Sequence, residues 1–370
     1  MMESCDVAIV GAGPAGATLA RLIGCGRKVM LFDRRRLDRP FDGAGFRKCC
    51  GGLLAPDAQK AMARAALALP ESVLGGPQLF AVRSVDLAAR MERYYQRFYL
   101  NLDREAFDRW LASLAAGSAE CRFGMEFLDY DGDERVARFR GADGLILAVR
   151  CNVLIAADGG ASAVRRKFQR ELRFDAAHNY YLAIQETLEP AGEMPFYGAF
   201  FEPAVTDFYG WTIPKRDTLL LGVALLPGVS ALRRFDAFKQ SLADYGFRFG
   251  KTLSRCGAVL ARPRRCSDLW LGDGSCLAIG EAAGWISPSS AEGFSFAFES
   301  ARIVSELLLE QPEPSVARYR VAAATLLRTL RGKVLKSPLI YNVGLRHAIM
   351  KSGLTAINPS SGRHRWSELS

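Results

Sequence analysis

The sequence predicts an α/β protein in which a Rossmann-type nucleotide-binding domain is interleaved with an antiparallel β-sheet domain and followed by a helical C-terminal segment. Three observations lead to this fold class. Near the N-terminus, an apolar strand runs directly into a glycine-rich turn and a helix. Two further apolar strands, far apart in the chain, each end in a polar turn that contains glycine. Between them, residues 180–226 alternate apolar and polar side chains in short runs, as in an antiparallel sheet with one buried face.

Composition agrees with a globular protein of two domains, or of one large unit with an inserted sheet. The chain has 370 residues, of which 49% are hydrophobic and 24% charged. A net charge of +10 favours acidic partners such as anionic lipid, whereas no nucleic-acid-binding motif is recognisable, so we expect no nucleic acid. The nine cysteines form no CxxC pair and there are only three histidines, so we expect no metal site and a reducing compartment.

The N-terminal strand, turn and helix form a complete nucleotide-binding unit. The strand Asp6–Val10 leads into the turn at 11–16, and a second strand ends at Asp33. The first glycine makes the tight turn, the second lets the backbone approach a pyrophosphate, and the third lets the helix pack closely. The acid can accept hydrogen bonds from ribose hydroxyls. The arginines at 34–36 could reach a nucleotide phosphate, but a solvated basic loop is the favoured interpretation of this run. The nucleotide-binding residues predicted here are Gly11, Gly13, Pro14, Ala15, Gly16, Asp33 and Arg34.

Two later segments resemble the remaining signatures of flavin hydroxylases and their relatives. The strand at 152–157 ends in a DGxxSxVR-like segment, whose acid and glycine lie near the cofactor pyrophosphate and ribose in that group. The strand at 276–279 ends in a GDAAG-like segment with Glu281 in place of aspartate, whose acid binds the ribityl chain in relatives. The helix after it would present its positive N-terminus to the flavin. The residues carried over are Asp158, Gly159, Gly280, Glu281, Gly284, Pro288 and Gly293.

A fourth segment supports the same cofactor. Arg104 lies just inside a predicted helix with Asp103 as its N-cap. Relatives carry a similar Arg-x-x-Phe-Asp sequence, in which the arginine approaches the FAD phosphates. A solvated arginine in the first helical turn is the alternative interpretation. The segments together predict FAD as the bound cofactor.

These segments identify a resemblance to the geranylgeranyl reductase family of hydroxylase-type flavoproteins, which share the glutathione-reductase-like FAD domain, and most closely to its colicin-M-resistance branch. The resemblance runs from Asp6 to about Gly353 and includes KCCGGLLAPDAQ and IGEAAGWISPSSAEG. In the family, a Cys-Gly-Gly loop lies against the isoalloxazine ring near the substrate double bond. This implies that the catalytic loop is Cys50, Gly51 and Gly52, with the Cys50 thiol as candidate proton donor. Plain packing, or a disulfide or metal role shared with Cys49, are the alternatives.

The region after residue 208 resembles the family's YxWxFP…GxG substrate signature. Ile213 replaces the phenylalanine and Ala224 the last glycine, which changes the shape of the implied pocket. The implied substrate-binding residues are Tyr209, Trp211, Pro214 and Gly222. The many aromatic residues between 180 and 211 suit an apolar ligand tunnel, but a sheet core would also explain them.

The cofactor segments are scattered, so the predicted domains interleave. The predicted domains are FAD binding at 1–75, 100–175 and 265–310, a substrate-binding sheet at 76–99 and 176–264, a basic helical region at 311–357 and a flexible tail at 358–370. The helical region breaks at Pro338 and carries arginines and lysines but no acid from 315 to 353. It can lie on anionic lipid, or pack its apolar face on the protein and leave its charges in water.

The expected function is that of an FAD-dependent oxidoreductase. The leading hypothesis is reduction of C=C bonds in an isoprenoid or other apolar substrate, with NAD(P)H or a reduced electron carrier as transient donor. One alternative is a monooxygenase that hydroxylates an aromatic substrate, and another is a membrane-peripheral flavoprotein with a role in envelope stress or colicin M tolerance. No signal peptide precedes the first strand, and no apolar run reaches the roughly 20 residues of a transmembrane helix, so we expect a cytoplasmic protein that can touch the inner face of the membrane.

Overall fold

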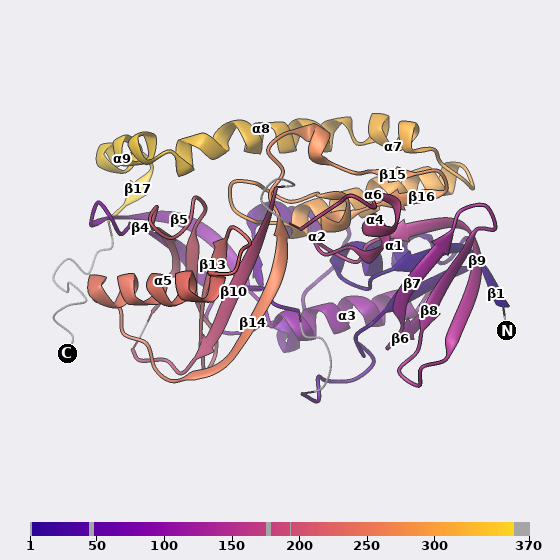
Figure 1. The fold of residues 1–370 in the computed structure, drawn as a ribbon, viewed down its shortest axis with the longest axis horizontal. Helices are drawn as coiled ribbons and strands as arrows, with labels where there is room; N and C mark the ends of the chain where they lie inside the picture. The colour runs from indigo at the N-terminus through magenta and orange to yellow at the C-terminus, as the bar shows by residue number, and fades with distance from the viewer. Residues whose placement is uncertain (1, 44–47, 175–178, 193, 359–370) are drawn as a thin grey trace.

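The structure is a computed structural model that describes residues 2–43, 48–174, 179–192 and 194–358. Figure 1 shows a mainly parallel sheet beside a mainly antiparallel sheet, with the C-terminal helices running above both. This is the predicted α/β architecture with an interleaved antiparallel sheet. The tail predicted to be flexible, apart from Asn358, lies outside the described residues.

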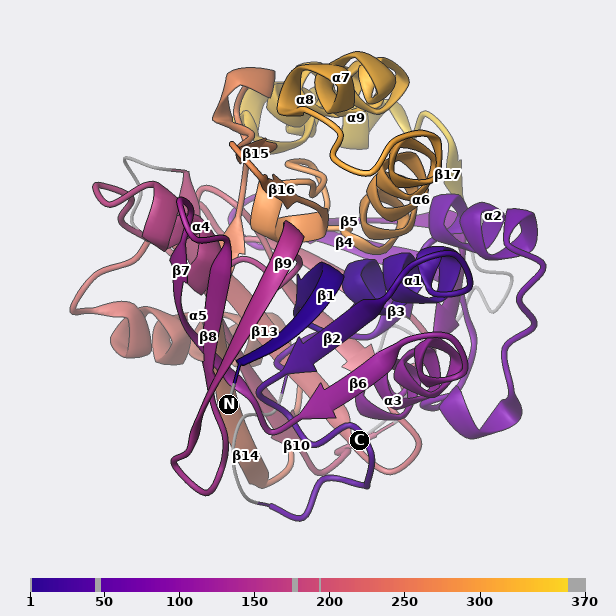
Figure 2. The same ribbon diagram turned by 90° about the vertical axis from the view of Figure 1, so that its right-hand side faces the viewer.

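The parallel sheet forms the nucleotide-binding part. Its strands, in spatial order, are β15 (Gly272–Asp273), β16 (Cys276–Ala278), β9 (Ile146–Ala156), β1 (Met2–Val10), β2 (Val29–Asp33) and β6 (Glu120–Phe123), with β7 (Glu126–Asp131) and β8 (Val136–Arg140) joined through β9. Figure 2 shows α1 (Pro14–Ile23) between α6 (Phe294–Glu310) and α3 (Arg104–Ala116) beside this sheet. The short helix α4 (Ala163–Phe168) contacts β7.

The register of this sheet brings the predicted motifs to one edge. Val10 of β1 pairs with Phe32 of β2 and with Ala156 of β9, and Ala156 pairs with Ala278 of β16. These strands are parallel, so their carboxyl ends are level and each is followed at once by one of the motif turns. Strand β1 begins at Met2, four residues before the predicted start, because its polar first residues still pair with β9.

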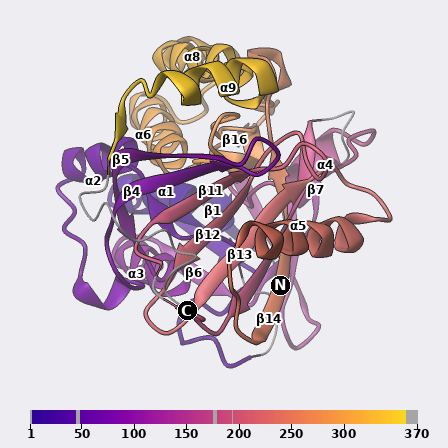
Figure 3. The ribbon, with the colours of Figure 1, turned by 90° about the vertical axis from the view of Figure 1, so that its left-hand side faces the viewer.

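The antiparallel sheet forms the wall opposite the nucleotide-binding turns. Its strands, in spatial order, are β14 (Thr252–Ala261), β10 (Tyr180–Leu188), β13 (Leu219–Leu225), β12 (Gly210–Pro214), β11 (Tyr197–Phe201), β4 (Leu79–Asp86), β5 (Met91–Asn101) and β17 (Ala356–Ile357), with β3 (Leu53–Leu54) paired to β5. Helix α5 (Ala231–Tyr245) covers one face of it, as Figure 3 shows. On β11, Phe200 contacts Phe238 of α5, whereas Phe201 points to the opposite face.

The C-terminal helices are α7 (Val316–Ala322), α8 (Ala324–Tyr341) and α9 (Val343–Ser352), and α2 (Pro56–Arg64) lies near the Cys-Gly-Gly loop. Pro338 lies inside α8, so the predicted break at this residue is wrong. The proline falls in the last turn, where it removes only one backbone hydrogen bond, and its carbonyl still accepts from the N–H of Asn342. The helix direction changes at Asn342, whose side chain caps α9 by accepting from the N–H of Leu345.

A buried ion pair ties α9 to the antiparallel sheet. Asp86, at the end of β4, is fully buried, and its Oδ2 lies 2.7 Å from Arg346 Nε and 3.0 Å from His347 Nε2. Burial alone would raise the pKa of Asp86, but hydrogen bonds from the Ala89 N–H and from Arg346 outweigh it and lower that pKa. The carboxylate therefore fixes the helix that closes one side of the cavity described below.

Replacing Asp86 with alanine should destabilise the protein by about 3–5 kcal/mol, because it leaves the buried Arg346 guanidinium without its counter-ion. The free energy of unfolding from urea denaturation measures this. The matched control is Glu126→Ala, which breaks an exposed ion pair with Arg140 and should cost less than about 1 kcal/mol. Equal effects of the two substitutions would contradict the assignment of Asp86 as the anchor of α9.

Candidate active site

A single cavity of about 1540 Å³ joins the nucleotide-binding turns to the antiparallel sheet. One side is formed by the turns that follow β1, β9 and β16. The other side is formed by the sheet strands β4, β5, β10, β11, β12 and β14 and by α8 and α9. The Cys-Gly-Gly loop lies between these two sides and lines the cavity with all three of its residues. The cavity therefore contains both the predicted cofactor segments and part of the predicted substrate signature.

The glycine turn after β1 has the geometry of a phosphate cradle. Gly11 has φ +104° and its N–H donates to the Phe32 carbonyl, so the chain turns sharply off the strand. A Cβ on Gly16 would overlap the Gly11 carbonyl oxygen, so only glycine lets α1 pack so closely. A Cβ on Gly13 would meet no atom within 4 Å, because this residue faces the cavity. Gly13 is also the N-cap of α1, so free backbone N–H groups and the positive end of the helix border the open space.

The turn after β9 presents a carboxylate with one unused oxygen. Asp158 Oδ2 accepts from the N–H groups of Ala163 and Val164, but its buried Oδ1 has no hydrogen-bond partner within the described residues. Burial raises the pKa of Asp158. Gly159, with φ +82°, follows it on the cavity wall. A hydrogen-bond donor on a ligand would satisfy the unused oxygen.

The turn after β16 places the Glu281 side chain at the end of β14. Its Oε1 accepts from the N–H of Ala261 at 3.2 Å, its Oε2 lies 4.0 Å from Lys48 Nζ, and a Cβ on Gly160 would contact Oε1. The longer side chain thus still faces the cavity, where it borders the Asp158 turn. The following helix α6 starts at Phe294, next to the cavity-lining Gly293.

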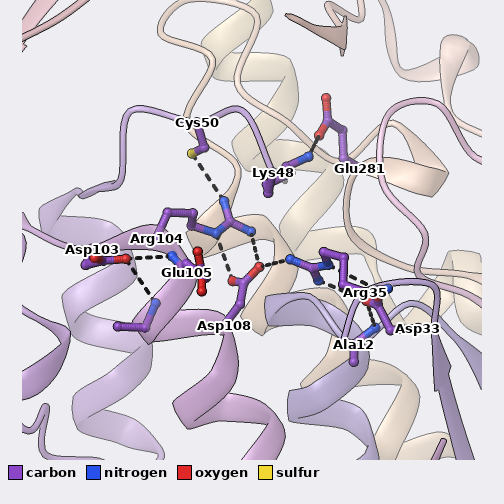
Figure 4. A network of polar contacts seen from close by, with 11 residues as sticks. Ala12, Asp33, Arg35, Lys48, Cys50, Asp103, Arg104, Glu105, Asp108 and Glu281 are labelled. Atoms are coloured by element: carbon purple, nitrogen blue, oxygen red, sulfur yellow. Dashed lines mark hydrogen bonds and ion pairs between the residues drawn. The ribbon is translucent and has the colours of Figure 1, made fainter. Parts of the chain in front are cut away.

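A continuous polar network, shown in Figure 4, connects the glycine turn to the Cys-Gly-Gly loop. Asp33 accepts from the N–H of Ala12 at 2.8 Å and from the guanidinium of Arg35. Arg35 also donates to Asp108 at 2.6 Å. From there, Arg104 bonds Asp108 through Nε at 2.8 Å and reaches Cys50 Sγ through Nη1 at 3.2 Å.

The charges in this network are balanced. Burial would raise the pKa of Asp108, but Arg104 and Arg35 outweigh it and hold that pKa below its ordinary value. Arg104 is buried against this carboxylate and stacks over the Phe294 ring at 4.9 Å, so it is not a solvated first-turn residue. Asp103 caps its helix as predicted, by accepting from the N–H groups of Glu105 and Ala106.

The Cys-Gly-Gly loop packs closely against its surroundings, and Gly52 is the position that requires glycine. A Cβ on Gly51 would overlap the Ile213 side chain, and a Cβ on Gly52, which has φ +66°, would overlap the Leu102 carbonyl. Ile213 is one of the two positions that depart from the family signature, and it lies directly against the loop. Cys50 Sγ also accepts from the N–H of Gly52 at 3.4 Å.

The two loop cysteines have different surroundings. Cys49 is buried, and a hydrogen bond with the Cys256 thiol together with burial raises its pKa. Cys50 is half-buried and lines the cavity. Both carry free thiols, and the described residues contain no cluster of histidine, cysteine and carboxylate side chains that could hold a metal ion.

A buried lysine fixes the loop from outside the cavity. Lys215, just after β12, donates to the carbonyls of Gly51 at 2.8 Å and Leu102 at 2.8 Å and to Asn101 Oδ1 at 2.7 Å. Burial lowers its pKa to about 8. The loop position therefore depends on an ammonium group more than 100 residues further along the chain.

The aromatic residues of the antiparallel sheet divide between core and cavity. Tyr197, Phe201, Tyr209 and Trp211 line the cavity, whereas Phe200 packs under α5. The Tyr209 hydroxyl donates to the Ser290 carbonyl at 2.9 Å, and burial raises its pKa to about 12. The sequence left two interpretations of these aromatic residues open, a ligand tunnel and a sheet core. The structure places some of the rings on the cavity wall and others in the core of the sheet.

Most predicted site residues line the cavity, but five do not. The predicted residues outside its lining are Gly16, Gly284, Pro288, Pro214 and Gly222. They support the wall instead: the Pro288 carbonyl accepts from Arg262, the Pro214 carbonyl accepts from Asn101, and Gly222 lies flat beneath the Trp211 indole. Arg34 is exposed at the cavity edge.

Sequence reasoning missed Asp108, Lys48 and Lys215. It favoured a solvated loop for the arginines at 34–36, which is wrong for Arg35 because this residue pairs with Asp33 and Asp108. Asp108 closes the Arg-x-x-Phe-Asp segment, which was the one available signal for it. Arg35 is adjacent to the predicted Arg34, but its bond to Asp108 joins positions 73 residues apart. For Lys215, the sequence offers no local pattern that indicates burial.

The fold matches solved flavoproteins. A geranylgeranyl bacteriochlorophyll reductase-like protein (Ta0516) from Thermoplasma acidophilum has a TM-score of 0.75 at 20% identity, over 92% of this chain and 88% of that one. PqsL from Pseudomonas aeruginosa, solved with 2-aminobenzoylacetate, has a TM-score of 0.67 at 19% identity, over 95% and 100% of the two chains. The flavin-dependent brominase Bmp2 has a TM-score of 0.67 at 18% identity, over 94% and 92%. At such identities the likeness defines the fold class, that of FAD-binding hydroxylases and reductases.

Closer relatives define the family. Protein CbrA of Escherichia coli O6:H1 (strain CFT073) is 39% identical over 362 residues, which are 96% of this chain and 95% of the relative. CbrA of Shigella flexneri serotype 5b (strain 8401) matches at the same identity and coverage. The chain therefore belongs to the CbrA family, the branch that its sequence resembles. No family model matches it, and the likeness to geranylgeranyl reductases is shown at the level of the fold.

Replacing Lys215 with methionine should destabilise the protein by about 1–3 kcal/mol, because it leaves buried oxygens without a donor. The pKa of Lys215 is about 8 in the folded protein and 10.5 in its ordinary range, so between these pH values the folded state binds fewer protons than the unfolded state. The stability of the wild type therefore rises with pH in this range, whereas that of the variant does not. The difference in stability between the two proteins should grow as pH rises above about 8. Urea denaturation of both proteins at several pH values measures the difference. The exposed Lys60→Met is the control. A difference that stays flat across this range would contradict burial of the ammonium.

Proposed function

We propose that this protein binds FAD and uses it to reduce a carbon–carbon double bond in an isoprenoid or other apolar substrate. The observation that carries the proposal is the continuous cavity, which runs from the glycine cradle past the Cys-Gly-Gly loop to the aromatic wall of the sheet. A reductase needs these parts in this order, because the reactive ring must face the substrate while the nucleotide half is held elsewhere.

The residues present suit FAD. Gly13 leaves open space at the N-terminus of α1, where backbone N–H groups can bind phosphate. Asp33 is fixed by Ala12 and Arg35 at the strand end where a ribose would lie. The unused Oδ1 of Asp158 offers an acceptor for a further hydroxyl or amide of the cofactor. These features support a dinucleotide in an extended pose along the level strand ends.

The chain's own groups suit a proton transfer beside the cofactor. When bound and reduced, FAD would be the source of a hydride for one carbon of the double bond, so the other carbon would need a proton. Cys50 is the candidate donor, because its thiol borders the cavity. Arg104 and the Gly52 N–H both point at its sulfur, so they can offset the negative charge left there after the proton moves. The aromatic wall would hold an apolar substrate and exclude water.

The proposal also requires an electron donor for the cofactor, and it competes with two other candidate functions. NAD(P)H or a reduced carrier protein would reduce the cofactor transiently. The fold also serves the flavin-dependent brominase named above, so oxygen chemistry on an aromatic substrate is the second candidate. A binding role in envelope stress without rapid turnover is the third candidate.

The cofactor assignment predicts opposite effects for two glycines of one turn. Gly13→Val should change the free energy of unfolding by no more than about 1 kcal/mol, the cost of a poorer N-cap for α1. It should weaken FAD binding more than about tenfold, since its side chain enters only open space. Gly16→Val should destabilise the fold itself, because its side chain overlaps the Gly11 carbonyl. Flavin fluorescence titration and urea denaturation separate the two effects. FAD affinity unchanged in Gly13→Val would refute this cradle.

The reaction is tested with lipids that co-purify with the protein, or with a prenyl lipid added to it. Anaerobic chemical reduction of the flavin should yield a product heavier by two hydrogen atoms, detected by mass spectrometry. Cys50→Ala should lower the rate of this step by about 10²–10⁴-fold and leave FAD affinity intact. Cys266→Ala, which changes a half-buried thiol outside the cavity, is the control. A product that instead gains oxygen in air would favour the monooxygenase.

A further inference from the structure

Six large apolar side chains are exposed on α8, on α9 and in the segment just after them. Leu335 is 72% exposed, and Leu354, just beyond α9, is 67% exposed. The other exposed apolar residues here are Leu339, Val343, Leu345 and Ile357. Leucines so exposed in one region of a protein surface mark a site of contact with something apolar.

The same surface is strongly cationic. Its exposed cations without an ion pair among the described residues are Arg320, Arg328, Arg331, Lys336 and Lys351. Arg328, Arg331 and Leu335 are spaced to lie on one side of α8, so charge and apolar surface are combined. From residue 314 to 358, all of which are described, the chain has no acidic residue. We name this surface, made of these cations and the exposed apolar residues above, the basic apolar face.

The cavity reaches this face. Lys336, Leu339, Leu354 and Ile357 are exposed and also line the cavity, so they mark its mouth. Figure 1 shows α8 and α9 following one another along the top of the protein, and Figure 3 shows α5 on a different side. A ligand leaving the aromatic end of the cavity would therefore emerge between the cations and leucines of the basic apolar face.

The geometry points to an anionic phospholipid bilayer as the occupant of this face. The helices would lie in the plane of the interface, with leucines among the acyl chains and arginines and lysines on the acidic headgroups. A protein partner would need a defined acidic counterpart, whereas a mixture of free cations and leucines around a cavity mouth suits a lipid surface. No helix in the described part of the chain is long and apolar enough to span a bilayer, so the contact would be peripheral.

This contact would give the cavity its supply of ligand. An apolar molecule could pass from the bilayer into the cavity without crossing water, where its exposure would be unfavourable. This last step rests on the proposed function, since it assumes an apolar substrate. The docking itself does not, because membrane binding can be measured without turnover.

The test is sedimentation of the FAD-loaded protein with phosphatidylcholine vesicles that contain or lack phosphatidylglycerol. Binding should require phosphatidylglycerol and weaken with salt. The double variant Arg328→Gln/Arg331→Gln should lose about thirtyfold in affinity, because each cation near an anionic surface contributes about fivefold. Leu335→Gln/Leu345→Gln should also lose about tenfold or more, through reduced insertion.

The control is the double variant Leu232→Gln/Arg233→Gln, which alters an exposed leucine and arginine on α5. It should bind vesicles as the wild type does. Wild-type protein that stays in the supernatant with anionic vesicles at low salt would overturn the proposal. So would a concentration-dependent dimer that the α8 and α9 variants dissociate, since a second copy would then cover the face. Neither result would affect the test of double-bond reduction.

Discussion

The level carboxyl ends of β1, β9 and β16 are the constraint on which the site depends. Parallel pairing places Val10, Ala156 and Ala278 side by side, so the turns that follow them meet although they lie more than 100 residues apart in sequence. A slip of one residue in either pairing would separate the turns and reverse the faces of the strand. The glycine cradle, the Asp158 carboxylate and the start of α6 are consequences of this one register.

The polar network connects these strand ends to the Cys-Gly-Gly loop. Two carboxylates, Asp33 and Asp108, alternate with two guanidinium groups, so the buried charges are neutralised within the network. A buried ion pair contributes little net stability, but removing one partner is strongly destabilising because the other charge is left buried and unpaired. The network therefore sets the position of Cys50 relative to the glycine turn rather than simply stabilising the fold. Lys215 does the same for the Gly51 carbonyl from the other side.

Local patterns were sufficient to predict the strands that end in the motif turns, the turns themselves and the fold class, because strand–glycine–helix units are encoded by consecutive residues. The sequence also indicated Asp103 as a helix cap and Cys50 as a cavity residue. It could not indicate Arg35 with Asp108, or Lys215 with Gly51, because these pairs form only when distant segments meet. The same limit explains Pro214 and Gly222, which belong to the matched signature yet support the wall from behind. The proposed break at Pro338 failed because a proline near the end of a helix costs only one hydrogen bond.

The central claim is that three strand ends and one loop build a single flavin site. Titration of the flavin-free protein with FAD, followed by quenching of flavin fluorescence, tests this claim most directly. The account predicts saturable binding of one FAD per chain and no comparable binding of NAD. Protein that is purified without flavin and leaves the fluorescence of added FAD unchanged would contradict it.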